Sequence, residues 1–197
     1  MTSFAPTMAF SRVADTSPPT KLHLGCGHEI LPGWINHDLA ELPGVDVVHD
    51  LDVYPWPFED DTFTEVRLYH VLEHLAEPMK AIAELHRISA AGGIVTIRVP
   101  YWNSQDWASD PTHRTRFNEY TFDFFDPSRR HGRIRPYYSS AKFRIRSQVF
   151  WIKPVWRYLP IRNVVGRRLL SAFARHLGGV IWVVEWDLEA LKNGGSP

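Results

Sequence analysis

The stretch KLHLGCGHEILPGWINHDLAELPGVDVVHDL, residues 21–51, decides the fold of this chain. One apolar run ends in the turn Gly25–Gly27, a second ends at Asp38, and a third ends at Asp50. Glycines after a buried strand allow a tight turn and the close approach of a ligand, because they carry no Cβ. A carboxylate at the tip of the next strand can accept hydrogen bonds from a ribose diol. A second acidic tip can take the exocyclic amine of a purine. The stretch therefore predicts a nucleoside-binding crevice at the carboxyl edge of a parallel sheet.

Two later segments extend this pattern. PWPFEDDTFTEVRLYHVLEHL (55–75) precedes an amphipathic stretch, and AAGGIVTIRVP (90–100) has the composition of a further strand. With them, residues 21–126 resemble the class I S-adenosylmethionine-dependent methyltransferases. The matching elements are the LxLGCG turn, the Asp38 and Asp50-Leu51 tips, the PF-x-D-x-x-F approach, the HVLEHL strand end and the GG-x-V-x-I-x-VP strand. A Rossmann dehydrogenase fits worse, because Ile30 stands where G-x-G-x-x-G needs its third glycine.

The resemblance implies an α/β, Rossmann-like sheet that is mostly parallel, with an antiparallel last strand. Only eight residues separate Gly25 from Trp34, whereas a parallel crossover normally takes about a dozen or more. The early helices should therefore shrink to single turns. Strands are expected at 22–24, 34–39, 45–51, 64–70, 93–99, 143–151 and 180–191. Helices are expected at Glu77–Ala90, Asn118–Phe125 and Val164–Leu177, the last with Val165, Leu169 and Phe173 on one face.

Length and composition indicate one globular domain over residues 21–197, after a flexible tail over residues 1–20. The single cysteine excludes an internal disulfide and fits a reducing compartment, so a cytoplasmic location is expected. No apolar run reaches the roughly 18 residues of a membrane span. The first 20 residues lack the basic start and apolar core of a secretory signal.

The zero net charge conceals a strong asymmetry. Residues 127–184 contain thirteen Lys and Arg residues but no Asp or Glu, which favours an anionic partner for this part of the chain. Three interpretations remain open. The segment could bind a phosphate-bearing or lipid-linked acceptor, or an anionic membrane surface. It could bind nucleic acid through phosphate neutralisation and stacking. It could also be an ordinary solvated basic face.

The resemblance implies S-adenosylmethionine as the cofactor. Asp38 would accept its ribose hydroxyls, and Asp50 would lie beside the adenine, with Asp52 as the alternative. Cys26 is interpreted as a small residue chosen for space, because no base is evident beside it. His23 stands where the resembling families usually carry an acid. The residues expected to bind the cofactor are Gly25, Cys26, Gly27, Asp38, Leu39, Asp50, Leu51 and His70.

Two histidines are candidate general bases, because a histidine changes its charge near neutral pH. His70 follows the fourth strand, where the resembling families place residues between cofactor and acceptor; a purely structural role is an equal alternative. His113 lies in the loop 101–120 after the fifth strand, and loops at strand ends often carry function. An arginine of this loop could clamp an anionic acceptor in a bidentate manner. The expected substrate-binding residues are Trp102, Asp110, Arg114 and Arg116.

The motif His70-x-x-Glu73-His74 also has a spacing that could hold a divalent ion. Some methyltransferases, including those acting on RNA 3′ ends and on quinone precursors, use a similar Glu-x-x-Glu-His cluster. Here a histidine replaces the first acid, so no metal is expected.

The chain is therefore predicted to be an S-adenosylmethionine-dependent methyltransferase. The expected reaction is O-methylation of a small, sugar-like or lipid-linked anionic acceptor. The alternatives are an RNA methyltransferase, which is less favoured, and a non-catalytic partner subunit that binds the cofactor. Peripheral contact with an anionic membrane and a homodimer are further expectations. The sheet face that the short early helices leave open could be covered by the N-terminal tail, by the late helix or by a second subunit.

Overall fold

A computed structural model describes residues 20–153 and 158–192 of the 197-residue chain. The predicted tail therefore lies outside the described residues, apart from Thr20 at the start of the first strand. The strands are β1 Thr20–Leu24, β2 Ile35–Asp38, β3 Val47–Val48, β4 Phe63–Tyr69, β5 Ser89–Pro100, β6 Phe143–Ile152, β7 Leu159–Ile161 and β8 Val183–Ala190. The helices are α1 Pro78–Ile88, α2 Gln105–Ser109, α3 Arg130–Ile134 and α4 Val164–Ala174, with 3-10 turns η1 Thr121–Phe124 and η2 Pro136–Tyr138.

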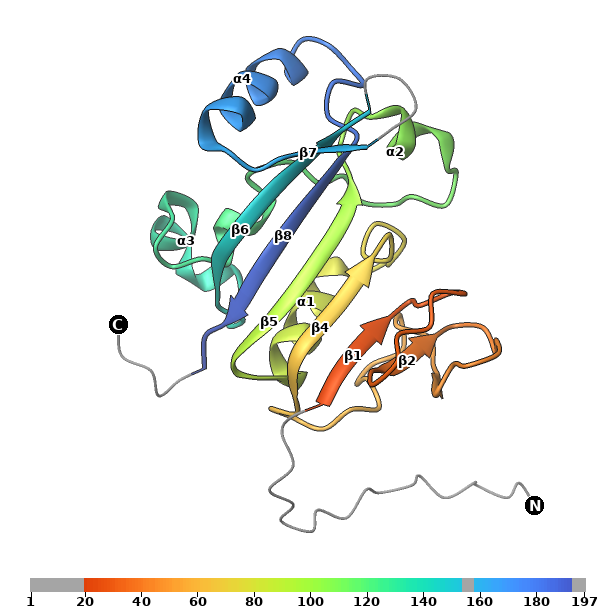
Figure 1. Ribbon diagram of the computed structural model, residues 1–197. Helices are drawn as coiled ribbons and strands as arrows, with labels where there is room; N and C mark the ends of the chain where they lie inside the picture. Colours follow the sequence, from red (N-terminus) through yellow and green to blue (C-terminus); the bar gives the residue numbers. More distant parts are fainter. Residues whose placement is uncertain (1–19, 154–157, 193–197) are drawn as a thin grey trace, which may run out of the picture.

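One eight-stranded sheet joins these strands in the order β3-β2-β1-β4-β5-β8-β6-β7 (Figure 1). The pairs among β1 to β5 are parallel, and β8 runs antiparallel to β5. The predicted Rossmann-like sheet with an antiparallel last strand is confirmed. The short edge strand β7 was not part of the prediction. Because the strand order reverses between β1 and β4, this point is where open α/β sheets bind ligands.

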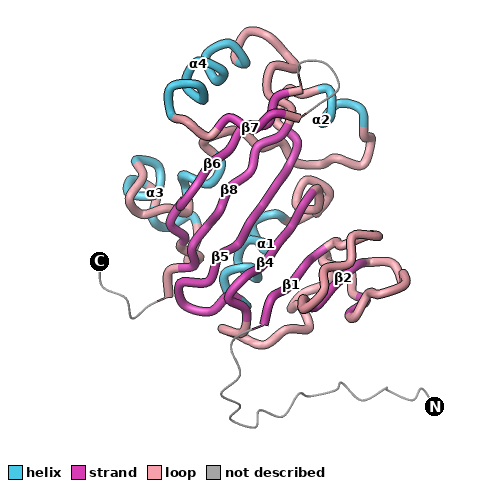
Figure 2. Tube along the Cα trace, viewed as in Figure 1, coloured by secondary structure: helices cyan, strands magenta, loops and turns pink. Residues whose placement is uncertain are grey.

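The early connections contain no helix within the described residues. Turns and loops link β1 to β2, β2 to β3 and β3 to β4, and Figure 2 shows these segments as loops around β1 and β2. The predicted reduction of the first helices to turns is therefore confirmed. The first helix among the described residues is α1, which connects β4 to β5 and lies behind them in Figure 1.

Helix α1 covers the apolar side of the sheet. Pro78 lies in its first turn, where a missing N–H costs nothing. Its core-facing side chains join those of β4 and β5 in one hydrophobic core, which includes Ile82, Leu85, Val66 and Ile97. The predicted helix end at Ala90 is wrong, because the backbone is already extended at Ser89 and the strand β5 begins there.

The opposite side of the sheet is polar. Lys21 and Glu65 form an ion pair of 2.7 Å across β1 and β4, and Arg98 of β5 reaches the carboxylate of Glu185 in β8 at 2.5 Å. The guanidinium of Arg67 lies over the ring of Trp34 at 5.0 Å. These pairs allow the face to meet water without a covering helix. A homodimer that covers it stays a prediction.

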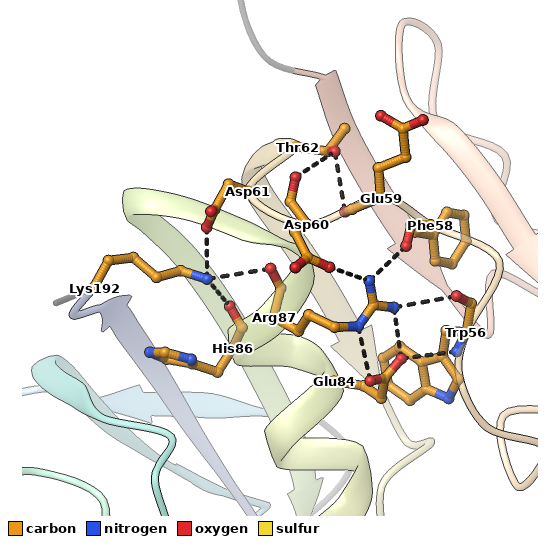
Figure 3. Close-up of polar contacts among 10 residues, drawn as sticks. All are labelled: Trp56, Phe58, Glu59, Asp60, Asp61, Thr62, Glu84, His86, Arg87 and Lys192. Atoms are coloured by element: carbon orange, nitrogen blue, oxygen red, sulfur yellow. Dashed lines mark hydrogen bonds and ion pairs between the residues drawn. The ribbon is translucent and has the colours of Figure 1, made fainter. Parts of the chain in front are cut away.

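A network around Arg87 of α1 fixes the long β3–β4 loop (Figure 3). Its guanidinium donates to both carboxylate oxygens of Glu84 at 2.8 and 2.7 Å and to Asp60 at 2.7 Å. It also donates to the carbonyls of Phe58 and Trp56, at 2.7 and 3.1 Å. These contacts hold the loop on the helix by side-chain bonds, in the absence of a second helix.

Two helices later in the chain differ from expectation. The predicted helix Asn118–Phe125 is the 3-10 turn η1, and Asn118 accepts a hydrogen bond from the N–H of Tyr120 at 2.9 Å. The predicted helix Val164–Leu177 is α4, which ends at Ala174. None of the described helices has the length and apolar character needed to cross a membrane.

Candidate functional site

A cavity of about 270 Å³ lies where the strand order reverses. Six of the eight predicted cofactor residues line it, while Cys26 and Gly27 do not. Its lining residues are Gly25, His37, Asp38, Leu39, His49, Asp50, Leu51, His70, Val71, His74 and Leu75. The carboxyl ends of β1, β2 and β4 thus bring together residues that are far apart in the sequence.

The glycine turn after β1 builds one wall of this cavity. Gly25 has a φ of 64°, and a Cβ at this position would collide with Val71, another lining residue. Both facts require glycine here. The backbone N–H of Gly27 donates to the carboxylate of Asp38 at 2.7 Å. Cys26 is buried, and burial raises the pKa of its thiol, which fits the predicted packing role.

Asp38 serves the turn and still faces the cavity. One carboxylate oxygen accepts from Gly27, and the other accepts from the N–H of Ala40 at 3.0 Å. An ionised carboxylate has about four lone-pair sites, so two bonds leave it able to accept hydroxyl donors from a ligand. The turn role and a ribose-binding role are therefore compatible.

At the end of the third strand, the structure favours Asp50 over Asp52 as the residue beside the adenine. Asp50 lines the cavity, whereas Asp52 accepts the N–H of Ala76 at 2.9 Å and does not line it. The indole N–H of Trp56 donates to the carbonyl of Leu51 at 3.0 Å. Arg87 donates to the carbonyl of Trp56, and Trp56 in turn donates to Leu51. The Arg87 network therefore also fixes the backbone at Leu51, beside the cavity.

Two lining histidines, His37 and His49, were not predicted. The Nε2 atom of His37 lies 3.0 Å from the carbonyl oxygen of His49, so Nε2 carries the proton. Burial lowers the pKa of His37 to about 4, which leaves the ring neutral at pH 7. His37 directly precedes Asp38, and His49 directly precedes Asp50. Because both acids were predicted to lie at the site, the sequence could have indicated that the two histidines lie there as well.

His70 lines two cavities. It contributes to the 270 Å³ cavity and to a second one of about 260 Å³, whose lining residues are His70, Arg98, Trp151, Tyr158 and Val183. Its φ is 55°, an uncommon value for a residue with a side chain, and its N–H donates to the carbonyl of Arg98 at 2.8 Å. Backbone conformations of this kind cluster at functional sites. The structure thus places His70 in the wall between the two cavities.

The second cavity was not predicted, because its residues come from distant parts of the chain: β5, β6, β8 and the positions just after β4 and just before β7. The guanidinium of Arg98 lies over the rings of Tyr69 and Trp151, at 4.0 and 4.9 Å. Its ion pair with Glu185 offsets its charge. The cavity therefore offers aromatic surface with a few polar groups, a combination that suits a small polar ring.

Behind His70 lies a buried carboxylate. The Glu73 side chain is fully buried, and neither oxygen has a hydrogen-bond partner among the described residues. The Nδ1 atom of His70 lies 3.3 Å from Glu73, and the Nε2 atom of His113 lies 3.9 Å from it. The Nδ1 atom of His113 lies 2.9 Å from the carbonyl of Trp107, to which it donates, so its Nε2 is free to accept a proton.

The same cluster is where the described chain could hold a metal ion. Ligand atoms of Glu73, His74 and His113 lie within 4.8 Å of one another. Histidine nitrogens and a carboxylate suit a divalent transition metal. The absence of a metal from this cluster stays a prediction.

The loop 101–120 does not bring its expected substrate-binding residues to either cavity. Asp110 accepts from the N–H and hydroxyl of Thr112 at 2.8 and 2.6 Å. The guanidinium of Arg116 stacks on Trp107 at 4.1 Å. Arg114 and Trp102 do not line either cavity. All four substrate-binding residues had been predicted only from their position in the chain.

Comparison with known proteins agrees with this geometry. Residues 22–97, from β1 to within β5, match the family described as Methyltransferase domain. Over this part of its length the chain is similar to methyltransferases. It is 36% identical over 63 residues to an uncharacterized 37.1 kDa protein in transposon TN4556 of Streptomyces fradiae, a match to 32% of this chain and 18% of that protein. It is 44% identical over 43 residues to an uncharacterized methyltransferase of Schizosaccharomyces pombe, a match to 22% of this chain and 16% of the relative. The matches thus span less than a fifth of either relative's length.

The fold is also found among solved structures. A SAM-dependent methyltransferase from Archaeoglobus fulgidus superposes with a TM-score of 0.57 at 18% identity, over 87% of this chain and 86% of that one. At this identity the likeness concerns the fold. The predicted resemblance to class I methyltransferases is confirmed, and the family match with this fold implies S-adenosylmethionine as the cofactor.

Proposed function

We propose that this domain is an S-adenosylmethionine-dependent methyltransferase with its cofactor in the 270 Å³ cavity. The observation that carries the proposal is the position of His70, which lines both this cavity and the second one. A group between two adjoining cavities can serve cofactor and acceptor together. The second cavity would then hold the acceptor.

The residues of the first cavity suit the parts of this cofactor. Asp38 has free acceptor capacity for the ribose hydroxyls, and Asp50 with Leu51 would lie along the adenine. The turn at Gly25 lets the methionine part approach the backbone. This arrangement would direct the methyl group toward His70.

S-adenosylmethionine supplies an electrophilic methyl group and leaves as S-adenosylhomocysteine after its methyl–sulfur bond breaks. The acceptor oxygen forms the new bond to the methyl carbon, and its proton passes to His70. Glu73, 3.3 Å from Nδ1 of His70, orients the ring and stabilises the charge that it gains. His113, held beside Glu73, is the second candidate base of the cluster. The main contribution of the site is alignment of acceptor and methyl group.

The acceptor we propose is small and sugar-like or lipid-linked, and it is methylated at oxygen. Trp151 and Tyr158 provide aromatic surface for a ring, and His70 and Arg98 provide polar groups beside it. This proposal moves the acceptor from the loop 101–120 to the second cavity. The cytoplasm suits a sequence with one cysteine.

An RNA methyltransferase is the second candidate. The basic residues of 127–184 favour it, because phosphate neutralisation drives RNA binding.

The test is transfer of a radiolabelled methyl group from S-adenosylmethionine to fractionated small molecules, lipids and RNA. The variant His70→Asn is the sharpest probe, because asparagine tolerates positive φ. We expect it to lose transfer by roughly 10²-fold or more even at saturating S-adenosylmethionine, the range of general base catalysis. His131→Gln, in α3, is the control and should keep full transfer. Full transfer by His70→Asn would refute the proposed base. Cofactor binding without transfer to any fraction would favour a non-catalytic subunit.

A further inference from the structure

Helix α4 is attached to the sheet by one narrow side. Ala174 is buried in the core, and Leu170 packs against it. The side-chain amide of Asn103 donates to the carbonyl of Ala174 at 2.6 Å, and Ser171 donates to the carboxylate of Glu119. Asn163 caps the first turn by accepting the N–H of Gly166 at 2.6 Å. The helix is therefore anchored and ordered through this side.

The opposite side of α4 is apolar and faces solvent. Val165, Leu169 and Phe173 are 69%, 57% and 58% exposed, and their spacing of four residues places them on one helical face. Leu177, three residues beyond the helix, is also 57% exposed. A surface helix normally turns its apolar stripe toward the core. A contiguous apolar patch of this kind marks an interaction site.

Arginines border this patch. Arg162, Arg168 and Arg175 are exposed, and no carboxylate of the described residues forms an ion pair with any of them. Over residues 127–184 the sequence contains no acid at all. An apolar stripe flanked by arginines is the composition of a helix that lies in the interface of an anionic membrane.

We infer that α4 docks this protein onto an anionic lipid surface, with the face defined by Val165, Leu169 and Phe173 in the headgroup layer. Charge complementarity selects this occupant. A second copy of the chain that used the same face about a twofold axis would bring arginines against arginines. Anionic lipid satisfies the apolar stripe and the arginine border together.

The docking surface lies close to the proposed acceptor cavity. β7, Leu159–Ile161, leads directly into α4, and Tyr158 just before β7 lines the second cavity. Figure 1 shows α4 and β7 at the end of the sheet where β5 finishes. Docking would present this end of the sheet to the membrane surface, which supports a lipid-linked acceptor. This last step alone depends on the proposed function.

The test is vesicle flotation of the full chain with phosphatidylcholine vesicles that contain or lack phosphatidylserine. We expect flotation with the anionic vesicles only, and loss of it as salt concentration rises. The double variant Leu169→Asp/Phe173→Asp should lower partitioning by at least about tenfold, because it removes apolar contact and adds repulsion. Ile134→Asp is the matched control, since Ile134 is 53% exposed in the same basic segment but belongs to α3. It should float like the unaltered protein.

Affinity for S-adenosylhomocysteine, measured on every variant, separates this inference from the proposed function and confirms folding. Normal flotation by the double variant would overturn the inference, as would absence of flotation in the unaltered protein. A dimer of the unaltered protein that the double variant dissociates, together with no flotation, would also overturn it, and would identify α4 as a subunit interface.

Discussion

The substitution Asp38→Asn removes one charge from the proposed ribose site with almost no change in shape. Asp38 already accepts two backbone N–H groups, at 2.7 and 3.0 Å, and the proposal adds the ribose hydroxyls. A hydrogen bond to a charged group contributes about 1.5–3 kcal/mol. Loss of the charge should therefore weaken S-adenosylhomocysteine binding roughly 10- to 150-fold, since each 1.4 kcal/mol is about tenfold. Isothermal titration calorimetry measures this directly.

The matched control is Asp46→Asn. The Asp46 carboxylate accepts the N–H of Asn36 at 2.8 Å, so it has a similar structural role, but it does not line the cavity. Both variants should lose about 1–2 kcal/mol of unfolding free energy, because a backbone N–H loses its charged acceptor. Only Asp38→Asn should lose affinity. Unchanged affinity in a folded Asp38→Asn protein, or an equal loss in both variants, would refute the reasoning.

Three further predictions concern stability and metal. Burial lowers the pKa of His37 from 6.5 to about 4. Between about pH 4 and pH 6.5 the unfolded chain therefore binds more protons than the folded chain. The free energy of unfolding should therefore fall as pH drops from 6.5 to about 4, and His37 should contribute on the order of 3 kcal/mol to this fall. In urea unfolding, the stability of His37→Gln should depend less steeply on pH than that of the unaltered protein. Equal pH dependence in the two proteins would contradict this. Arg87→Met should lower the free energy of unfolding by about 2–4 kcal/mol, because it leaves the carboxylate of Glu84 without its partner. Lys80→Met removes the exposed ion pair of Lys80 with Glu77 at 3.8 Å and should lower the free energy of unfolding by less than about 1 kcal/mol. Similar losses in the Arg87 and Lys80 variants would argue against a stabilising role of the Arg87 network. Methyl transfer should survive EDTA, because His70 replaces the first acid of the metal-binding motif. A loss that Mn²⁺ restores would make Glu73, His74 and His113 metal ligands.

The part of the fold that was predictable follows from local spacing. The glycine turn and the acidic strand tips specify where β1, β2 and β3 end, and the short intervals between them exclude full helices. The cofactor cavity could be predicted as well, because the carboxyl ends of parallel strands lie at the same edge of the sheet. The structure adds His37 and His49, which precede two of those acids.

The acceptor side was less predictable because it depends on contacts across the sheet. Arg98, Trp151 and Tyr158 meet only because β8 inserts between β5 and β6. Likewise, His113 was predicted as a base from its loop, but its position beside Glu73 depends on how that loop returns to the sheet. The N–H of Arg114 donates to the carbonyl of Glu73 at 2.8 Å, and sequence spacing cannot specify such a bond.

Helix α4 shows a different limit. The periodicity of Val165, Leu169 and Phe173 predicts a helix with these residues on one face, and the structure has that helix. Periodicity does not tell whether the face is buried by the same chain or by a partner. Here the buried side is formed by Leu170, Ser171 and Ala174, which are smaller or less regularly spaced.

A crystal structure of the protein with S-adenosylhomocysteine tests the central claim most directly. We predict density for the ligand in the 270 Å³ cavity, with its ribose hydroxyls within hydrogen-bond distance of Asp38, its adenine beside Asp50 and its sulfur facing His70. Density for the ligand outside this cavity, or no density at a saturating concentration, would contradict the account.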